Sequence, residues 1–259
     1  MGNTYTERET MLAAMISNCR ITGIQIEWAR EMIRNELEVA GRGEEYDPDY
    51  IPTFREIVLA CEAQNPPYDL WFREHEEGEV NNEAKFFEWA KTEDFGNWKI
   101  VSICDDNSNT GFYGLAIETG EYTQNGVENG IIFSTRGTEP TTWEQKYLDL
   151  VSTDLDIINS DITEQEKVMY EYLDKEFAQL LEEKGYTNLA TAGHSLGGYL
   201  AFSAAAHMVY MRGYASEIFM QGTNIDGPGV TEENLSNPEN QVIYAEINDR
   251  LTHYHYTVE

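Results

Sequence analysis

One serine in the chain has glycines at the spacing that a catalytic nucleophile requires. Residues 193–198 read GHSLGG, which fits the G-x-S-x-G pattern of a nucleophile elbow centred on Ser195. The serine of such an elbow has a strained backbone, so the residues two before and two after it must be small. The pattern predicts that the Ser195 hydroxyl attacks an acyl carbonyl and that the Leu196 N–H helps to stabilise the resulting oxyanion.

The flanking segments fit the strand and the helix that an elbow joins. Residues 187–192 are apolar and β-branched, as in a short buried strand, and residues 199–211 are rich in alanine and other helix formers. This context favours the catalytic interpretation over a glycine-rich turn that only connects two elements. His194 neighbours the serine, but adjacent elbow residues point in different directions, and we interpret His194 as a packing residue.

Three motifs in this order resemble the class 3, or fungal-type, lipase family. They are GHSLGG at 193–198, the strand and turn IIFSTRGT at 131–138, and DGPG at 226–229. The DGPG form is more similar to poorly characterised bacterial members of the family. The resemblance covers roughly residues 95–250 and implies an α/β-hydrolase with a central, mostly parallel sheet.

The resemblance implies a serine ester hydrolase that acts on acyl lipids, as a lipase or a phospholipase A type enzyme, through a Ser-Asp-His triad and an acyl-enzyme. A second oxyanion donor is needed from a nearby loop. Thr138, after the Gly of the RGT turn, is our candidate, and the resemblance implies the same position. It also implies a lid in the next segment, with Trp143 and Leu148 as its apolar residues; the alternative is a fixed amphipathic segment.

The acid of the triad is expected at the carboxyl end of a strand, where active-site groups of open α/β sheets gather. Residues 241–247 read QVIYAEI, the pattern of a strand, and Asp249 follows them. The lipase resemblance implies the same position, and we predict Asp249 as the acid. Asp226 is the weaker alternative, because the aspartate of a DGPG turn is commonly structural.

Two histidines follow the predicted acid. The order serine, acid, histidine of this fold leaves His253 and His255 as candidate bases. Both alternate with tyrosines in residues 252–258, which is also the pattern of a half-buried strand. Lipase relatives place the histidine several tens of residues after the acid. We therefore expect a C-terminally incomplete hydrolase core, either a fragment of a longer protein or a chain that ends early.

Two regions follow from the patterns along the chain. Residues 1–95 have helical periodicity and capping boxes but no chemistry of their own, which predicts a helical N-terminal segment that covers one side of the body. Residues 96–259 form the predicted α/β-hydrolase core. Its expected elements include strands at 98–104, 112–118 and 130–135, and a long helix from 163 to 185.

The composition limits the function classes. The 259 residues include 47 acidic and 17 basic side chains, for a net charge of −30. This charge repels nucleic acids and anionic bilayers, so no nucleic-acid partner is expected, whereas an ester substrate and a transient lipid-surface contact are. Cys19, Cys61 and Cys104 lack metal-ligand spacing, and we predict neither a metal nor a cofactor.

The sequence has neither a signal-peptide pattern nor an apolar run long enough to span a bilayer, which predicts a cytoplasmic protein, with signal-independent secretion as the alternative. Two other functions stay open. The chain is interpreted alternatively as a noncatalytic or partner-dependent lipid-binding domain, or as a lipase-type toxin domain of a larger secreted protein. Acyl chain length, head group and oligomeric state do not follow from the sequence.

Overall fold

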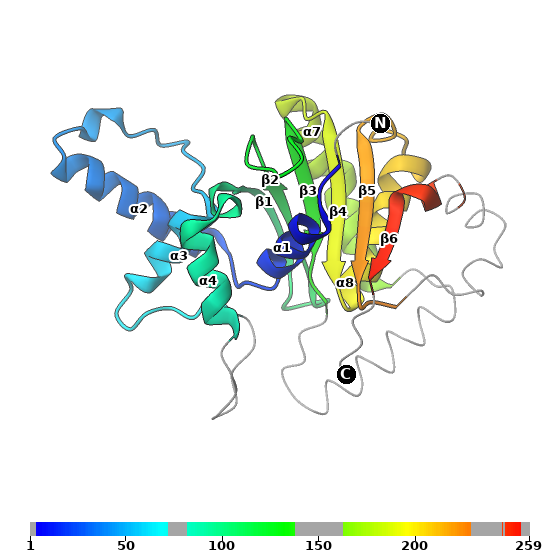
Figure 1. Ribbon diagram of the computed structural model, residues 1–259, viewed down its shortest axis with the longest axis horizontal. Coiled ribbons are helices and arrows are strands. Elements are labelled where there is room, and N and C mark those ends of the chain that lie inside the picture. The colour runs from blue at the N-terminus through cyan, green and yellow to red at the C-terminus, as the bar shows by residue number, and fades with distance from the viewer. Residues whose placement is uncertain (1–3, 72–81, 138–162, 229–244, 246, 255–259) are drawn as a thin grey trace.

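A computed structural model describes residues 4–71, 82–137, 163–228, 245 and 247–254 (Figure 1). Within these residues, six strands form one sheet in the order β1-β2-β3-β4-β5-β6. The strands are β1 (Lys99–Asp106), β2 (Phe112–Glu118), β3 (Gly130–Thr135), β4 (Asn188–His194), β5 (Phe219–Ile225) and β6 (Leu251–Tyr254). Spatial order therefore follows chain order.

The sheet has an antiparallel half and a parallel half. The pairs β1–β2 and β2–β3 are antiparallel, whereas β3–β4, β4–β5 and β5–β6 are parallel. The predicted α/β fold with a mostly parallel sheet is thus confirmed, as are the three strands expected between residues 98 and 135. Because β3 to β6 run in one direction, their carboxyl ends meet at one edge of the sheet.

Helices cover both faces of the sheet (Figure 1). Helix α1 (Glu7–Ser17) packs across β3 and β4 on one face, and α6 (Glu164–Tyr172), α7 (Ala178–Lys184) and α8 (Leu196–Ala206) cover the other. The π-helical segments η3 (Leu173–Phe177) and η4 (His207–Met211) extend α6 and α8. Successive residues of a strand point to opposite faces, so Ile132 joins one hydrophobic core while Ile131 and Phe133 join the other.

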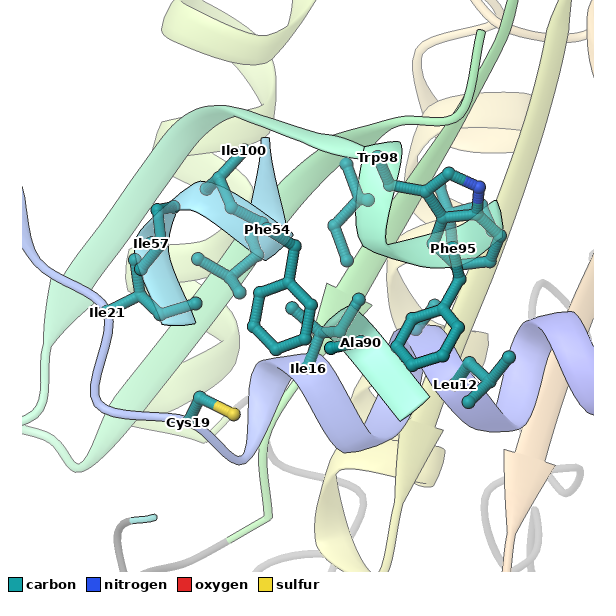
Figure 2. Packing of buried hydrophobic residues seen from close by; sticks show 14 of the residues in the cluster. Leu12, Ile16, Cys19, Ile21, Phe54, Ile57, Ala90, Phe95, Trp98 and Ile100 are labelled. Carbon is teal, nitrogen blue, oxygen red and sulfur yellow. The ribbon is translucent and has the colours of Figure 1, made fainter. Parts of the chain in front are cut away.

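The N-terminal region contributes directly to the first of these cores. It contains α2 (Gly23–Val39), η1 (Gly43–Glu45), α3 (Phe54–Glu62), α4 (Asn82–Thr92) and η2 (Asp94–Asn97) in addition to α1. Figure 2 shows side chains of α1, α3, α4 and η2 packed together with those that open β1. Trp98 is buried there, and its indole N–H donates to the Tyr122 carbonyl over 2.8 Å. Helix α1 therefore belongs to the folded body and does not only cover it.

The structure corrects the strand that was expected at residues 241–247. Ala245 and Ile247, the two of these residues that the structure describes, are helical, and η6 (Asn248–Arg250) follows them. The next strand is β6, which begins at Leu251. A short apolar run fits a buried strand and a helix segment equally well, and its periodicity alone does not separate them. In the described part of the chain, no helix has the length and apolar character needed to cross a membrane.

Candidate active site

Ser195 lies in the turn between β4 and α8, at the carboxyl edge of the parallel strands. Its backbone has φ 56° and ψ −135°, a conformation that non-glycine residues rarely adopt, and its side chain is exposed. The Ser195 N–H donates to the Ile225 carbonyl over 2.8 Å, and the Gly198 N–H donates to the Ser195 carbonyl over 2.8 Å. These bonds hold the strained turn between two neighbouring elements.

The glycines around Ser195 are required by space. A Cβ atom at Gly193 would lie 2.1 Å from the carbonyl oxygen of Gly197, and one at Gly197 would lie 2.3 Å from that of Thr135. A Cβ at Gly198 would lie 2.1 Å from the side-chain oxygen of Asn224. The predicted need for small residues at these positions is therefore confirmed, and Gly198 is where α8 approaches β5.

The turn after β3 passes beside the elbow. A Cβ at Gly137 would lie 3.2 Å from the Ser195 Cβ and 3.4 Å from the Leu196 backbone nitrogen. Leu196 is the first residue of α8, where a helix leaves its N–H groups without intrahelical partners. Thr138 directly follows Gly137 but lies outside the described residues, as do Trp143 and Leu148. The RGT turn thus reaches Ser195, while the roles of these three residues stay predictions.

The arginine of the RGT turn is a site residue that the sequence reasoning missed. The Arg136 guanidinium is buried, stacks on the Tyr113 ring at 4.4 Å and donates to the Asn107 side-chain oxygen over 2.7 Å. Its backbone N–H donates to the Tyr113 carbonyl over 3.0 Å. Arg136 therefore anchors the turn that lies against Ser195. An arginine at the end of an apolar strand was the signal in the sequence.

Asn224 is a second missed residue. It is fully buried near the end of β5, where its side-chain oxygen accepts from the Gly227 N–H and its amide donates to the Pro228 carbonyl, both over 2.9 Å. A Cβ at Gly227 would lie 2.2 Å from the Ser195 carbonyl oxygen. The described part of the DGPG turn thus packs directly behind the elbow, held by one amide side chain.

Asp226 lies at the same edge of the sheet. It has a positive φ of 51°, and its N–H donates to the Tyr254 carbonyl at the end of β6 over 2.8 Å. Desolvation lowers the pKa of the neighbouring His194, and the Asp226 carboxylate opposes this shift. The weaker of the two sequence candidates for the acid is therefore the one at the edge where Ser195 lies.

Asp249 lies at the opposite edge. It is in η6, which precedes β6, and Leu251 of β6 is in register with Gly222 of β5. The adjacent Arg250 donates to the Phe219 carbonyl, at the start of β5, over 2.9 Å. Leu251 is four residues along β6 from the level of Ser195, or about 13 Å at ~3.3 Å of rise per residue, and Asp249 precedes it. The expectation that Asp249 sits at the carboxyl end of a strand is wrong, because the strand follows it.

His253 lies on β6, in register with Asn224. Its ring packs edge-on against Phe202 with 6.4 Å between centroids, and Phe202 is seven residues beyond Ser195 along α8, or about 10 Å of helix. The interpretation of His253 as a strand residue is confirmed, whereas its role as base is not tested. His255 lies outside the described residues.

No protein-family model matches the chain, and no curated protein matches it. Among the described residues, no group of three His, Cys, Asp or Glu side chains could hold a metal ion. The described site therefore consists of an exposed serine on a strained turn, the N-terminus of α8, and two turns that pack against the serine from β3 and β5.

Proposed function

We propose that this protein is a serine ester hydrolase that forms an acyl-enzyme on Ser195. The observation that carries the proposal is the Ser195 backbone, at φ 56° and ψ −135°, between a parallel strand and a helix N-terminus. Strain of this kind costs about 1–3 kcal/mol and persists where the surroundings impose it, commonly at active sites. A turn that only connected β4 to α8 would not need a strained backbone at this residue.

In the proposed reaction, the Ser195 hydroxyl attacks the ester carbonyl while a histidine takes its proton. The Leu196 N–H and the Thr138 N–H stabilise the oxyanion, and collapse of the tetrahedral intermediate expels the alcohol, which takes the proton back from the histidine. Water then attacks the acyl-enzyme by the same route and releases the acid. The base is His253 or His255.

The acid that orients the base is better sought at Asp226 than at Asp249. The carboxyl edge of the sheet, where active-site groups of α/β proteins gather, holds Asp226 beside the end of β6. Asp249 precedes β6. An aspartate that lies more than about 13 Å along the strands from the level of Ser195 would require a different path of the chain to reach the same histidine.

The proposed substrates are carboxylic esters of acyl lipids, of lipase or phospholipase A type. The order of the GHSLGG, RGT and DGPG motifs supports this choice, as does the contact of the RGT and DGPG turns with the elbow. The net charge of −30 favours neutral or zwitterionic lipids over anionic ones at a membrane surface.

The test is hydrolysis of p-nitrophenyl butyrate and octanoate by the full chain and by Ser195→Ala. We expect the variant to lose at least ~10³-fold in rate. Ser216→Ala is the matched control, since Ser216 is exposed and distant in sequence, and it should retain wild-type activity. Labelling by a fluorophosphonate should require Ser195 and tests the nucleophile independently of the ester chosen.

Asp226→Asn and Asp249→Asn assign the acid in the same assay. Loss of the triad acid costs on the order of 10⁴-fold, so Asp226→Asn should be nearly inactive and Asp249→Asn nearly normal; the reverse would return the acid to Asp249. A folded wild-type chain that neither turns over esters nor reacts with the fluorophosphonate would contradict the hydrolase. Binding of zwitterionic vesicles by that inactive chain would favour a lipid-binding domain.

A further inference from the structure

Helix α2 buries little of its apolar surface. Of its 17 residues, only Gln25 and Ala29 are buried, while Val39 is 91% exposed. Most of the stability of a helix in a protein comes from packing of its apolar face. Helix α2 packs against α3 and η1 and projects away from the sheet (Figure 1). Ala29 belongs to the first hydrophobic core, whereas Trp28 and Met32 pack against that core while only half-buried, and Val39 is presented at the surface.

These side chains line a groove of about 630 Å³ between α2 and the end of α3. The apolar part of the lining consists of Trp28, Met32, Val39, Ala40, Ala60 and Ala63. Trp28 packs edge-on against Tyr68 with 5.4 Å between ring centroids, and this contact restrains the orientation of its ring. The alanines of α3 have short side chains, which leave room for the side chains of a bound segment.

The charged residues that line the groove are both acidic. They are Glu31 and Glu36, and neither forms an ion pair within the part of the chain that the structure describes. The nearby arginines are engaged elsewhere. Arg30 pairs with Glu27 at 2.6 Å, Arg42 pairs with Glu45 at 2.6 Å, and Arg34 lies 4.6 Å over the Tyr46 ring. The groove therefore combines an apolar floor with unneutralised carboxylates.

We propose that this groove binds an amphipathic helix of a partner protein, with lysines or arginines beside its apolar stripe. Trp28 and Val39 are eleven residues apart, which is about 16 Å of helix, or three turns. A partner helix of similar length would set apolar residues at i, i+3, i+4 and i+7 on the floor. Its basic residues would then pair with Glu31 and Glu36.

Charge selects this occupant over two others. A second copy of the chain would bring two acidic grooves together, and each copy carries a net charge of −30. An anionic bilayer would be repelled by the same carboxylates. A cationic helix gains from both the apolar floor and the charge. The groove is lined only by residues of α2 and α3 and those that directly follow these helices, and it is independent of the proposed esterase site.

The test uses a synthetic probe, a fluorescein-labelled 15-residue peptide of leucine and lysine with leucines at i, i+3, i+4 and i+7. Its affinity for the full chain is measured by fluorescence anisotropy in 150 mM salt. We expect saturable binding, at least tenfold weaker binding of the same peptide with glutamate for lysine, and at least tenfold weaker binding of a scrambled leucine–lysine peptide.

Variants on one helix locate the site. Val39→Asp and the double variant Glu31→Gln/Glu36→Gln should each weaken binding at least tenfold. Ile24→Asp is the matched control, because Ile24 is also an exposed aliphatic residue of α2, at 59%, but does not line the groove. It should change the affinity less than twofold. All three sites are at the surface, so the folding of the variants can be checked by circular dichroism.

Absence of saturable binding would overturn the proposal, as would equal affinity for the lysine and glutamate peptides. Equal effects of Val39→Asp and Ile24→Asp would show nonspecific attraction to an acidic protein. Analytical ultracentrifugation tests the remaining candidate occupant of the groove, a second copy of the chain. A dimer of the wild-type chain that Val39→Asp dissociates would mean that the groove binds a second copy and not a cationic helix.

Discussion

At Ser195, the strained backbone is restrained by two segments that are distant in sequence, the turn after β3 and the end of β5 with its turn. The turn after β3 contacts the serine through Gly137, the turn after β5 contacts it through Gly227, and the Ile225 carbonyl accepts the Ser195 N–H. A non-glycine residue at positive φ costs about 1–3 kcal/mol unless its surroundings fix it. The elbow conformation is therefore a property of the assembled sheet edge and not of the local sequence alone.

Replacing Gly193 by alanine should disrupt this edge. The new methyl group would lie 2.1 Å from the Gly197 carbonyl oxygen, a backbone atom that cannot turn aside. We expect a loss of about 3 kcal/mol in the free energy of unfolding, measured by urea denaturation. Gly23→Ala is the control, since no atom lies within 4 Å of the added group. A similar loss in both variants would contradict the steric argument.

The buried His207 should make stability depend on pH. Burial lowers the pKa of its imidazole, and the hydrogen bond with Asp174, at 2.8 Å, opposes this only in part. The folded protein thus favours the neutral ring, and the unfolded chain takes up a proton first as the pH falls below about 6.5. Stability should fall from there towards pH 5, and His207→Gln should remove that part of the slope.

Urea denaturation of both proteins at pH 7, 6 and 5 measures the slope. Burial raises the pKa of Asp174, but hydrogen bonds from His207 and Arg212 outweigh it, and the net pKa is lowered. The stability that Asp174 contributes is therefore present above about pH 3.9 and is lost only at lower pH, which keeps it outside the window. Identical slopes in wild type and variant would disprove the role of His207.

Residues in the site differ in how far the sequence predicted them. Ser195 and its glycines follow from one local motif, because the turn imposes its own residue types. The placement of Asp226 and Asp249 depends on where β6 begins, which the apolar run before Asp249 does not define. Asn224 is a polar residue in a strand, and only the three-dimensional fold shows that it holds the DGPG turn.

Between elements, a buried polar ladder joins α6 to α8. Its side chains recur every four residues and contact each other between the two helices. Glu166, Tyr170 and Asp174 come from α6 and η3, and Tyr199, Ser203 and His207 come from α8 and η4. The Glu166 carboxylate accepts from the Ser203 hydroxyl over 2.6 Å and from the Tyr199 hydroxyl over 3.2 Å. Its other oxygen accepts the Thr163 N–H over 3.0 Å in the capping box of α6.

Glu166→Ala should therefore destabilise the contact between the two helices. The change removes an acceptor that buried hydroxyls share and half of the capping box, and hydrogen bonds to charged groups contribute about 1.5–3 kcal/mol each. We expect a loss of about 3 kcal/mol, measured by urea denaturation. Glu164→Ala on the same helix removes only an exposed pair with Lys167, worth about 0–1 kcal/mol. Equal losses would mean that burial of the ladder contributes nothing.

Whole elements were predicted best where their ends carry their own signals. Residues 6–9 (TERE) and 163–166 (TEQE) match the capping-box pattern, and both boxes are formed at the starts of α1 and α6. The three strands expected between turn signals from residue 98 to residue 135 were also predicted correctly. The π-helical segments η3 and η4, which follow α6 and α8, had no signal in the sequence that distinguishes them from ordinary helix.

At the scale of the molecule, the sequence predicted an α/β sheet with helices but not how the N-terminal region joins it. Helix α1 lies in contact with β3 and β4. The hydrophobic core on that face of the sheet therefore contains residues from both sides of the domain boundary that the sequence predicts near residue 95. Periodicity along the chain gives the apolar face of α1 but not its partner. Contacts of that kind are set by the three-dimensional arrangement of the sheet.

The net charge of −30 should oppose folding through repulsion among surface carboxylates. The Debye length falls from about 30 Å at 0.01 M salt to about 10 Å at 0.1 M, so added salt screens repulsion between charges that are far apart on the surface. The exposed ion pairs that salt also weakens, such as Arg30–Glu27 and Lys167–Glu164, contribute about 0–1 kcal/mol each.

We therefore expect a net gain of about 1–2 kcal/mol in the free energy of unfolding, or roughly 4 °C in Tm, between these salt concentrations. Differential scanning calorimetry at constant pH measures it. A Tm that stays constant or falls would contradict net repulsion, because the attraction that salt weakens would then be at least as large as the repulsion that salt screens.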